Sequence, residues 1–71
     1  MTDEQLDDVF SYHAPKRQQP QQYEAIRAAA KAFARTLLAN TPPCADQSAA
    51  IRKVREAVMT ANASIALEGR V

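Results

Sequence analysis

The sequence lacks most of the residues that small proteins use to support a fold or to carry out chemistry. Among its 71 residues there is no tryptophan, one cysteine, one glycine and one histidine. A single cysteine excludes an internal disulfide, and Cys44 together with His13 falls short of the roughly four ligands of a structural zinc site. Domains of this size bury only about 60% of their unfolded surface and usually need a disulfide, a metal or a partner subunit. We therefore expect a homo-oligomer without a metal site.

The sequence also lacks targeting signals and a strong charge of either sign. No run approaches the roughly 20 apolar residues of a membrane span, and no signal peptide is visible. A lone cysteine fits a reducing compartment, so we expect a cytoplasmic protein with no membrane partner. The net charge is +1, with four acids and no base in residues 1–10 and nine bases against four acids in the rest. That excess is small for binding duplex DNA or RNA, but it suffices for a compact ligand with a few phosphates.

Hydrophobic periodicity predicts an all-α fold, because no alternating run typical of a strand occurs. Thr2 and Gln5 have the spacing of a capping box and predict a short helix over about residues 3–10. Residues 11–22 contain Pro15 and Pro20 and read as an extended connector, since residues before proline avoid the helical region. We expect one domain over residues 1–71.

Two longer helices follow the connector. The first is expected from near Pro20 to about Asn40, and the second from Cys44 or Ala45 to about Leu67, with Gly69 as its C-terminal cap. The Pro42-Pro43 turn between them predicts an antiparallel hairpin. Each helix carries a seam of apolar residues with the 3-4-3-4 spacing of a coiled coil. The seams comprise Tyr23, Ile26, Ala30, Phe33 and Leu37, and Ile51, Val54, Val58, Ala61 and Ile65. Many alanines lie on other faces, which fits either helix propensity alone or burial by neighbouring subunits.

No catalytic set is recognisable, so we expect a protein that is not an enzyme. Cys44 has no base partner, and nucleophilic catalysis needs such a pair. Tyr12, His13 and Pro15 form an aromatic–imidazole pair on a stiffened connector. A tyrosine there could stack on a nucleobase, or it could pack as a half-buried anchor for the first helix. The residues alone favour the anchor.

A basic stripe is the second polar feature. Arg27, Lys31 and Arg35 are spaced four apart and share one helix face. A solvated face is the common explanation of such a stripe, but only Glu24 offers a balancing acid, and guanidinium groups suit phosphates or a guanine edge. Arg52, Lys53 and Arg55 on the next helix look like ordinary surface.

These motifs carry a family resemblance over about Phe10 to Leu67. The strings FSYHAP, QYEAIRAAAKAFA, NTPP and IRKVREAVMTANASIAL resemble the phage anti-CBASS cyclic-nucleotide sponge family, whose domain also occurs in some anti-Thoeris sponges. The resemblance implies a small helical protein that assembles as a homohexamer in the cytoplasm of the infected bacterial host. It implies sequestration of cyclic dinucleotides, and possibly cyclic trinucleotides, without cleavage, and no cofactor.

The resemblance also implies roles for six residues. Tyr12 falls on the position that stacks on a base, and Arg27 and Lys31 fall on the basic positions that contact a base edge or the phosphates, in a pocket between subunits. His13 and Pro15 belong to the same motif and line the pocket. Arg70 lies where the match fades and is a weaker candidate for a trinucleotide site. Cys44 departs from the serine-like helix cap that is common in the family, which affects the start of the helix rather than ligand binding.

Two other functions remain open. A helical interaction protein, such as an antitoxin-like adaptor, explains the amphipathic hairpin equally well but not the Tyr12–His13 pair together with the basic stripe. A nucleic-acid binder would lose duplex affinity steeply with ionic strength, and the small excess of positive charge argues against it.

Overall fold

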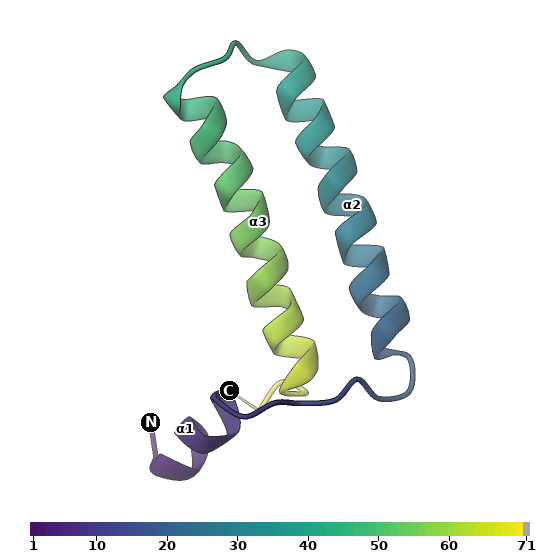
Figure 1. Cartoon of the computed structure of the whole chain (residues 1–71), viewed down its shortest axis with the longest axis vertical. Coiled ribbons are helices and arrows are strands. Elements are labelled where there is room, and N and C mark those ends of the chain that lie inside the picture. Colours follow the sequence, from purple (N-terminus) through teal and green to yellow (C-terminus); the bar gives the residue numbers. More distant parts are fainter. Residues whose placement is uncertain (71) are drawn as a thin grey trace.

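The computed structural model describes residues 1–70 and contains three helices: α1 (Asp3–Val9), α2 (Gln19–Asn40) and α3 (Ala45–Ala66). No strand occurs in this range, so the predicted all-α class is confirmed. The two long helices run antiparallel and side by side, and α1 lies at the open end of the hairpin that they form (Figure 1). Residue 71 of the expected domain lies outside the described residues.

The short helix α1 begins as the capping-box spacing predicts. The backbone N–H of Gln5 donates to Thr2 Oγ1 over 3.1 Å, and the backbone N–H of Thr2 donates to Gln5 Oε1 over 2.9 Å. Asp3 and Glu4 lie in the first turn, where the positive end of the helix dipole favours acids. The helix ends at Val9, one residue earlier than expected, with Phe10 as its C-cap.

The connector enters α2 through a tight turn that is tied to α3. Arg17 has a φ of 48°, in the left-handed region that residues other than glycine seldom adopt. Gln19 accepts a hydrogen bond from the backbone N–H of Lys16 over 2.9 Å, and its amide nitrogen donates to the Ile65 carbonyl over 3.0 Å. One glutamine side chain therefore joins the connector, the start of α2 and the end of α3.

The turn between α2 and α3 is closed by side chains. Gln47 donates through Nε2 to both the carbonyl and the hydroxyl oxygen of Thr41, at 3.1 Å each. Cys44 is the N-cap of α3, and its sulfur accepts from the backbone N–H of Gln47 over 3.4 Å. A thiol is a weak acceptor, so Cys44 does cap the helix but does so with a weak hydrogen bond.

The C-terminal end of α3 differs from expectation in one residue. The N–H of Gly69 donates to the Ser64 carbonyl over 3.0 Å and that of Glu68 to the Ile65 carbonyl over 3.1 Å, which is the Schellman pattern. In this motif the left-handed residue that follows the C-cap is Glu68, with a φ of 52°, and Gly69 comes one position later. The expected glycine cap is therefore displaced by one residue, because α3 ends at Ala66.

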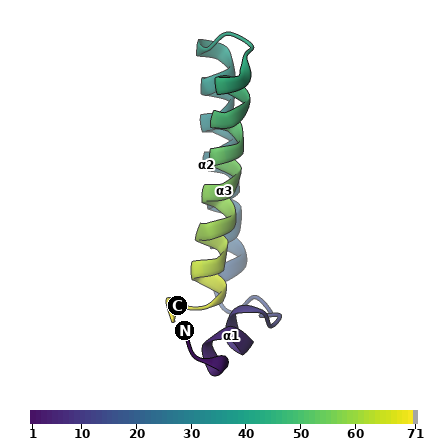
Figure 2. The same cartoon turned by 90° about the vertical axis from the view of Figure 1, so that its left-hand side faces the viewer.

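The hairpin is a slab one helix thick (Figure 2), and the chain as a whole has extents of 45 × 27 × 15 Å. Each long helix therefore covers only one face of the other. The predicted seam residues are half-buried, except Phe33, which is 55% exposed. Within residues 1–70 only Leu67, at 8% exposed, is fully buried. A single chain thus lacks a closed core, and the expected oligomer stays a prediction.

Candidate functional site

The connector presents Tyr12 to solvent. Its side chain is 86% exposed, and Pro15 is exposed as well. This exposure is incompatible with the interpretation of Tyr12 as a half-buried anchor of α1 within one chain. The ring is free to stack on another planar group, which is what the alternative interpretation requires.

His13 is turned back onto α1 instead. Its Nε2 lies 2.6 Å from the backbone carbonyl oxygen of Asp8 and 3.5 Å from the Asp8 carboxylate. The ring is half-buried. Neighbouring residues of the connector therefore have different surroundings: His13 fixes the path of the chain, and Tyr12 points outward from it.

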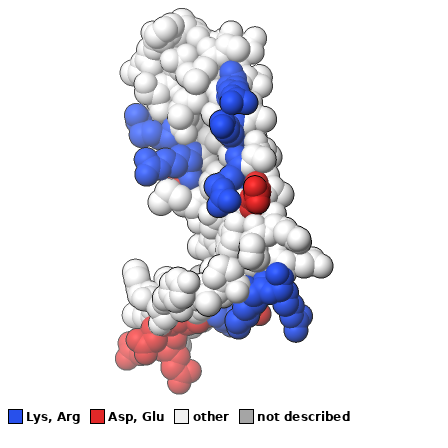
Figure 3. All heavy atoms as spheres, turned by 45° about the vertical axis from the view of Figure 1, so that its right-hand side comes forward, with Lys and Arg blue, Asp and Glu red and all other residues white. Residues whose placement is uncertain are grey.

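The predicted basic residues of α2 line a hollow on the long helices. Arg27 and Lys31 lie there together with Arg55 of α3, in a hollow of ≈ 500 Å³. Glu24 is the one acid of its lining, and the rest is apolar: Ala28, Ala30, Val58 and Met59. Figure 3 shows basic side chains along the long helices, while acidic side chains gather near the α1 end. Arg35 belongs to the same stripe in the sequence but is not part of the lining.

Arg55 is a candidate that the sequence did not single out. It was grouped with Arg52 and Lys53 as ordinary surface, yet it joins the hollow that Arg27 and Lys31 line. The position of Arg55 in the hollow depends on how α3 is rotated against α2, and the sequence of neither helix alone indicates that rotation. Three cations around an apolar floor can bind phosphates by charge-assisted hydrogen bonds, and an exposed thioether such as that of Met59 offers contact to an aromatic base.

A single chain does not bring the two halves of the predicted site together. Tyr12, His13 and Pro15 lie on the connector at the open end of the hairpin, and none of them belongs to the lining of the hollow. Arg27 and Lys31 lie in the middle part of α2 instead and line the hollow. Within one chain the connector residues and the hollow are therefore separate.

Arg70 is engaged within the chain. Its Nε and Nη2 donate to the two carboxylate oxygens of Asp8, each over 2.9 Å. The hydrogen bonds from Arg70 hold the pKa of the Asp8 carboxyl below its usual range, and the same hydrogen bonds raise the pKa of the guanidinium. Any anion that bound Arg70 would compete with Asp8.

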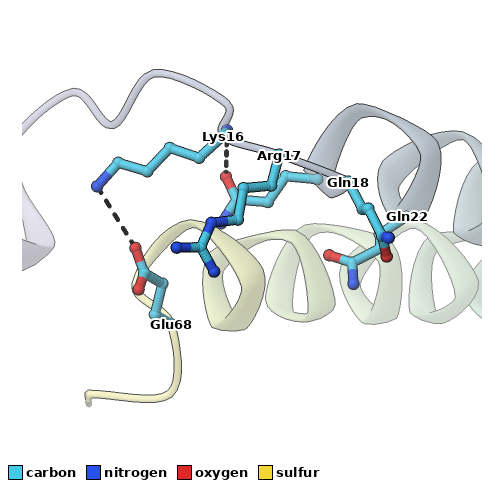
Figure 4. Close-up of a pocket in the computed structure, with 6 residues that line it drawn as sticks. Lys16, Arg17, Gln18, Gln22 and Glu68 are labelled. Carbon is cyan, nitrogen blue, oxygen red and sulfur yellow. Dashed lines mark hydrogen bonds and ion pairs between the residues drawn. The ribbon is translucent and has the colours of Figure 1, made fainter.

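A second hollow lies beside this ion pair, at the open end of the hairpin. It measures ≈ 560 Å³ and is lined by Lys16, Arg17, Gln18, Gln19, Gln22 and Glu68. Figure 4 shows Lys16 reaching Glu68, whose carboxylate lies 3.6 Å from the ammonium nitrogen. The guanidinium of Arg17 extends into the space between Glu68 and Gln22.

An apolar groove of ≈ 700 Å³ also follows the hairpin. Its lining comes from both long helices and includes Ile26, Phe33, Leu37, Val54, Ala57 and Ala61. These are largely the predicted seam residues, so part of the seam faces outward. Over residues 1–70 no helix is long and apolar enough to cross a membrane, and no cluster of three potential metal-ligating side chains occurs.

Comparison with known proteins identifies the family of the chain. No curated protein and no solved structure matches the chain significantly. The model of the Acb2/Tad1 hairpin domain matches residues 2–66. This family is the sponge family of the anti-CBASS and anti-Thoeris proteins, a class of binding domains rather than enzymes, and membership implies binding of cyclic oligonucleotides in general. The resemblance drawn from the motifs is confirmed: the chain belongs to the Acb2/Tad1 hairpin-domain family.

Proposed function

We propose that this chain is a phage-encoded sponge that binds cyclic dinucleotides and holds them without cleaving them, so that CBASS signalling is blocked in the cytoplasm of the infected bacterium. The family match over residues 2–66 carries the proposal. The hollow lined by Arg27, Lys31 and Arg55 supports it, because it combines three cations with an apolar floor. Such a lining suits a ligand that is both polyanionic and aromatic.

The site we propose lies between subunits of a homo-oligomer, with a hexamer as the expected assembly. Tyr12 of one subunit would stack on a base, and Arg27 and Lys31 of another would bind the phosphates or a base edge. His13 and Pro15 would shape the connector around the ligand. Two observations support this arrangement: Tyr12 is 86% exposed, and it is absent from the lining of the hollow within its own chain. The outward-facing apolar groove supplies a surface for the contact between subunits.

We further propose that Arg70 contributes to a separate site for cyclic trinucleotides. The side chain lies at the open end of the hairpin, where it is bound to Asp8. A trinucleotide phosphate would replace the Asp8 carboxylate on the guanidinium. No cofactor takes part, since sequestration needs binding alone.

The decisive experiment recovers the ligand after binding. The purified protein is incubated with a panel of cyclic di- and trinucleotides, binding is measured by calorimetry, and the bound nucleotide is released by heat denaturation and identified by chromatography. We expect an intact cyclic dinucleotide in stoichiometric amounts. Recovery of linear products would contradict sequestration, and absence of binding across the panel would contradict the function as a whole.

The exposed apolar groove favours one alternative, a helical adaptor whose seam packs on another protein. Light scattering separates the two functions. A sponge with sites between subunits is an oligomer at micromolar concentration, whereas an adaptor with a free groove is a monomer that binds no cyclic nucleotide.

A further inference from the structure

Polar side chains join helix α1 to the connector and to the segment after α3. Close backbone contacts between helices occur only between α2 and α3 within the described chain. A seven-residue helix is too short to be stable by itself, and none of its residues is fully buried. The position of α1 therefore depends on a small number of specific interactions.

One of these interactions is the ion pair between Asp8 and Arg70. Both carboxylate oxygens accept from the same guanidinium at 2.9 Å, a bidentate geometry that fixes orientation as well as distance. The two residues lie 62 positions apart in the chain, so the pair joins the last turn of α1 to the segment just after α3. The Nε2 atom of His13 makes a second contact with Asp8, at the backbone carbonyl oxygen of the aspartate.

The other end of the connector is fixed to the same place. Lys16 pairs with Glu68 at 3.6 Å (Figure 4), and Glu68 in turn lies 3.9 Å from Nη1 of Arg70. The backbone of Lys16 is also bound by Gln19. The segment from Asp8 to Lys16, which we call the arch, is therefore bound at both of its ends to residues 68–70. Tyr12 lies at its midpoint.

We propose that Asp8 and Arg70 are positioning residues for nucleotide binding: their ion pair holds the arch in the shape that presents Tyr12 to the ligand. This inference rests on the proposed function. An exposed ring on a free connector would have to be ordered when the ligand binds, and that ordering costs affinity. Because the ion pair orders the connector before the ligand binds, this entropic cost does not reduce the affinity. Asp8 would act on affinity without touching the ligand.

The test compares Asp8→Ala with Asp7→Ala. Both changes remove one negative charge near the end of α1. Within the described residues the side chain of Asp7 forms no ion pair. The backbone carbonyl of Asp7 accepts a hydrogen bond from the Ser11 hydroxyl, and Asp7→Ala leaves that carbonyl in place. Calorimetry with 3′,3′-cyclic GMP–AMP should show that Asp8→Ala weakens binding about tenfold, the scale expected for ordering one or two side chains. Asp7→Ala should bind as the unmodified protein does.

A double-mutant cycle separates positioning from a general loss of structure. In a Tyr12→Ala background there is no ring left to present, so Asp8→Ala should have no further effect on the dissociation constant. A merely structural role would weaken binding by the same factor in both backgrounds, which would overturn the inference. Circular dichroism and light scattering check that helix content and assembly are retained, and Asp8→Asn serves as a milder variant if Asp8→Ala does not fold.

The outcomes distinguish this inference from the function on which it rests. If the unmodified protein binds no cyclic dinucleotide, the proposed function fails and the inference fails with it. If the unmodified protein and Asp8→Ala bind equally well, the inference alone is wrong. If Asp8→Ala binds more weakly and the effect vanishes without Tyr12, the positioning role is established.

Discussion

The hollow on the long helices and the arch that carries Tyr12 are built by different means. Arg27 and Lys31 lie one helical turn apart on α2, so the helix itself sets their separation. Tyr12 lies on a connector whose shape depends on contacts with residues 68–70 at the other end of the chain. The first half of the proposed site is therefore rigid because of local structure, and the second half is only as rigid as a few exposed polar contacts make it.

The largest expected effect on nucleotide affinity comes from removing the basic side chains of the rigid half. Removing both Arg27 and Lys31 should weaken cyclic dinucleotide binding by at least about 3 kcal/mol, since a hydrogen bond to a charged group contributes about 1.5–3 kcal/mol. Calorimetry measures the loss. Arg35→Ala combined with Arg52→Ala is the matched control, because it also removes two positive charges from the long helices, and neither residue lines the hollow or the apolar groove. An equal loss in the control would mean that overall charge, rather than the hollow, attracts the ligand.

Breaking the other half should have a smaller effect. Tyr12→Ala should weaken binding by about 1–3 kcal/mol, the contribution of one base stacked on an aromatic ring. Tyr12→Phe keeps the ring and should lose much less, which separates stacking from a hydrogen bond of the hydroxyl. Unchanged affinity of Tyr12→Ala would remove this residue from the site.

Acid should loosen the arch while leaving the long helices in place. The pKa of Asp8 is lowered by its hydrogen bonds with Arg70, so the ion pair stabilises the folded arch above the ordinary aspartate pKa of 3.8 and is lost as the pH falls below it. Arg70, Glu68 and His13 are the charged or titratable groups around it. The NMR shift of the Arg70 Nε–H should move as Asp8 is protonated, and amide shifts in the middle of α2 should not. In Asp8→Asn the Arg70 Nε–H shift should respond much less to pH over the same range.

The smallest effect is expected far from both halves, at the turn of the hairpin. Cys44→Ser replaces the 3.4 Å sulfur cap of α3 with a hydroxyl, and a serine cap contributes about 1 kcal/mol to helix stability over a poor one. The free energy of unfolding should rise by up to about that amount, measured by thermal denaturation at fixed protein concentration. Nucleotide affinity should stay the same, because Cys44 contacts neither the hollow nor the arch.

The helices were predictable from the sequence because their signals are local. The Thr2–Gln5 capping box, Pro20 and the Pro42-Pro43 turn each act within a few residues, and the observed bounds differ from expectation by about one residue. The end of α3 shows the limit of such signals. Gly69 marked the region, but the left-handed position belongs to Glu68, since the exact residue at which a helix ends also depends on its packing.

The site was less predictable, since its decisive contacts are long-range. Arg27 and Lys31 could be paired from their spacing, whereas Arg55 enters the hollow only through the rotation of α3 against α2. The pairing of Arg70 with Asp8 joins the two ends of the chain, and no local pattern indicates it. The exposure of Tyr12 contradicts, within one chain, the anchor interpretation that the residues favoured, because that interpretation assumed a core large enough to bury the ring.

Because the hairpin is only one helix thick, we expect the stability of the protein to depend on its concentration. A slab one helix thick, with one fully buried residue among residues 1–70, stabilises itself poorly. In the proposed oligomer most burial therefore occurs only when chains meet. Folding and assembly are then one equilibrium, and its midpoint shifts with protein concentration. For the proposed phage sponge, the number of assembled sponges early in an infection, when few copies exist, would rise faster than the number of chains.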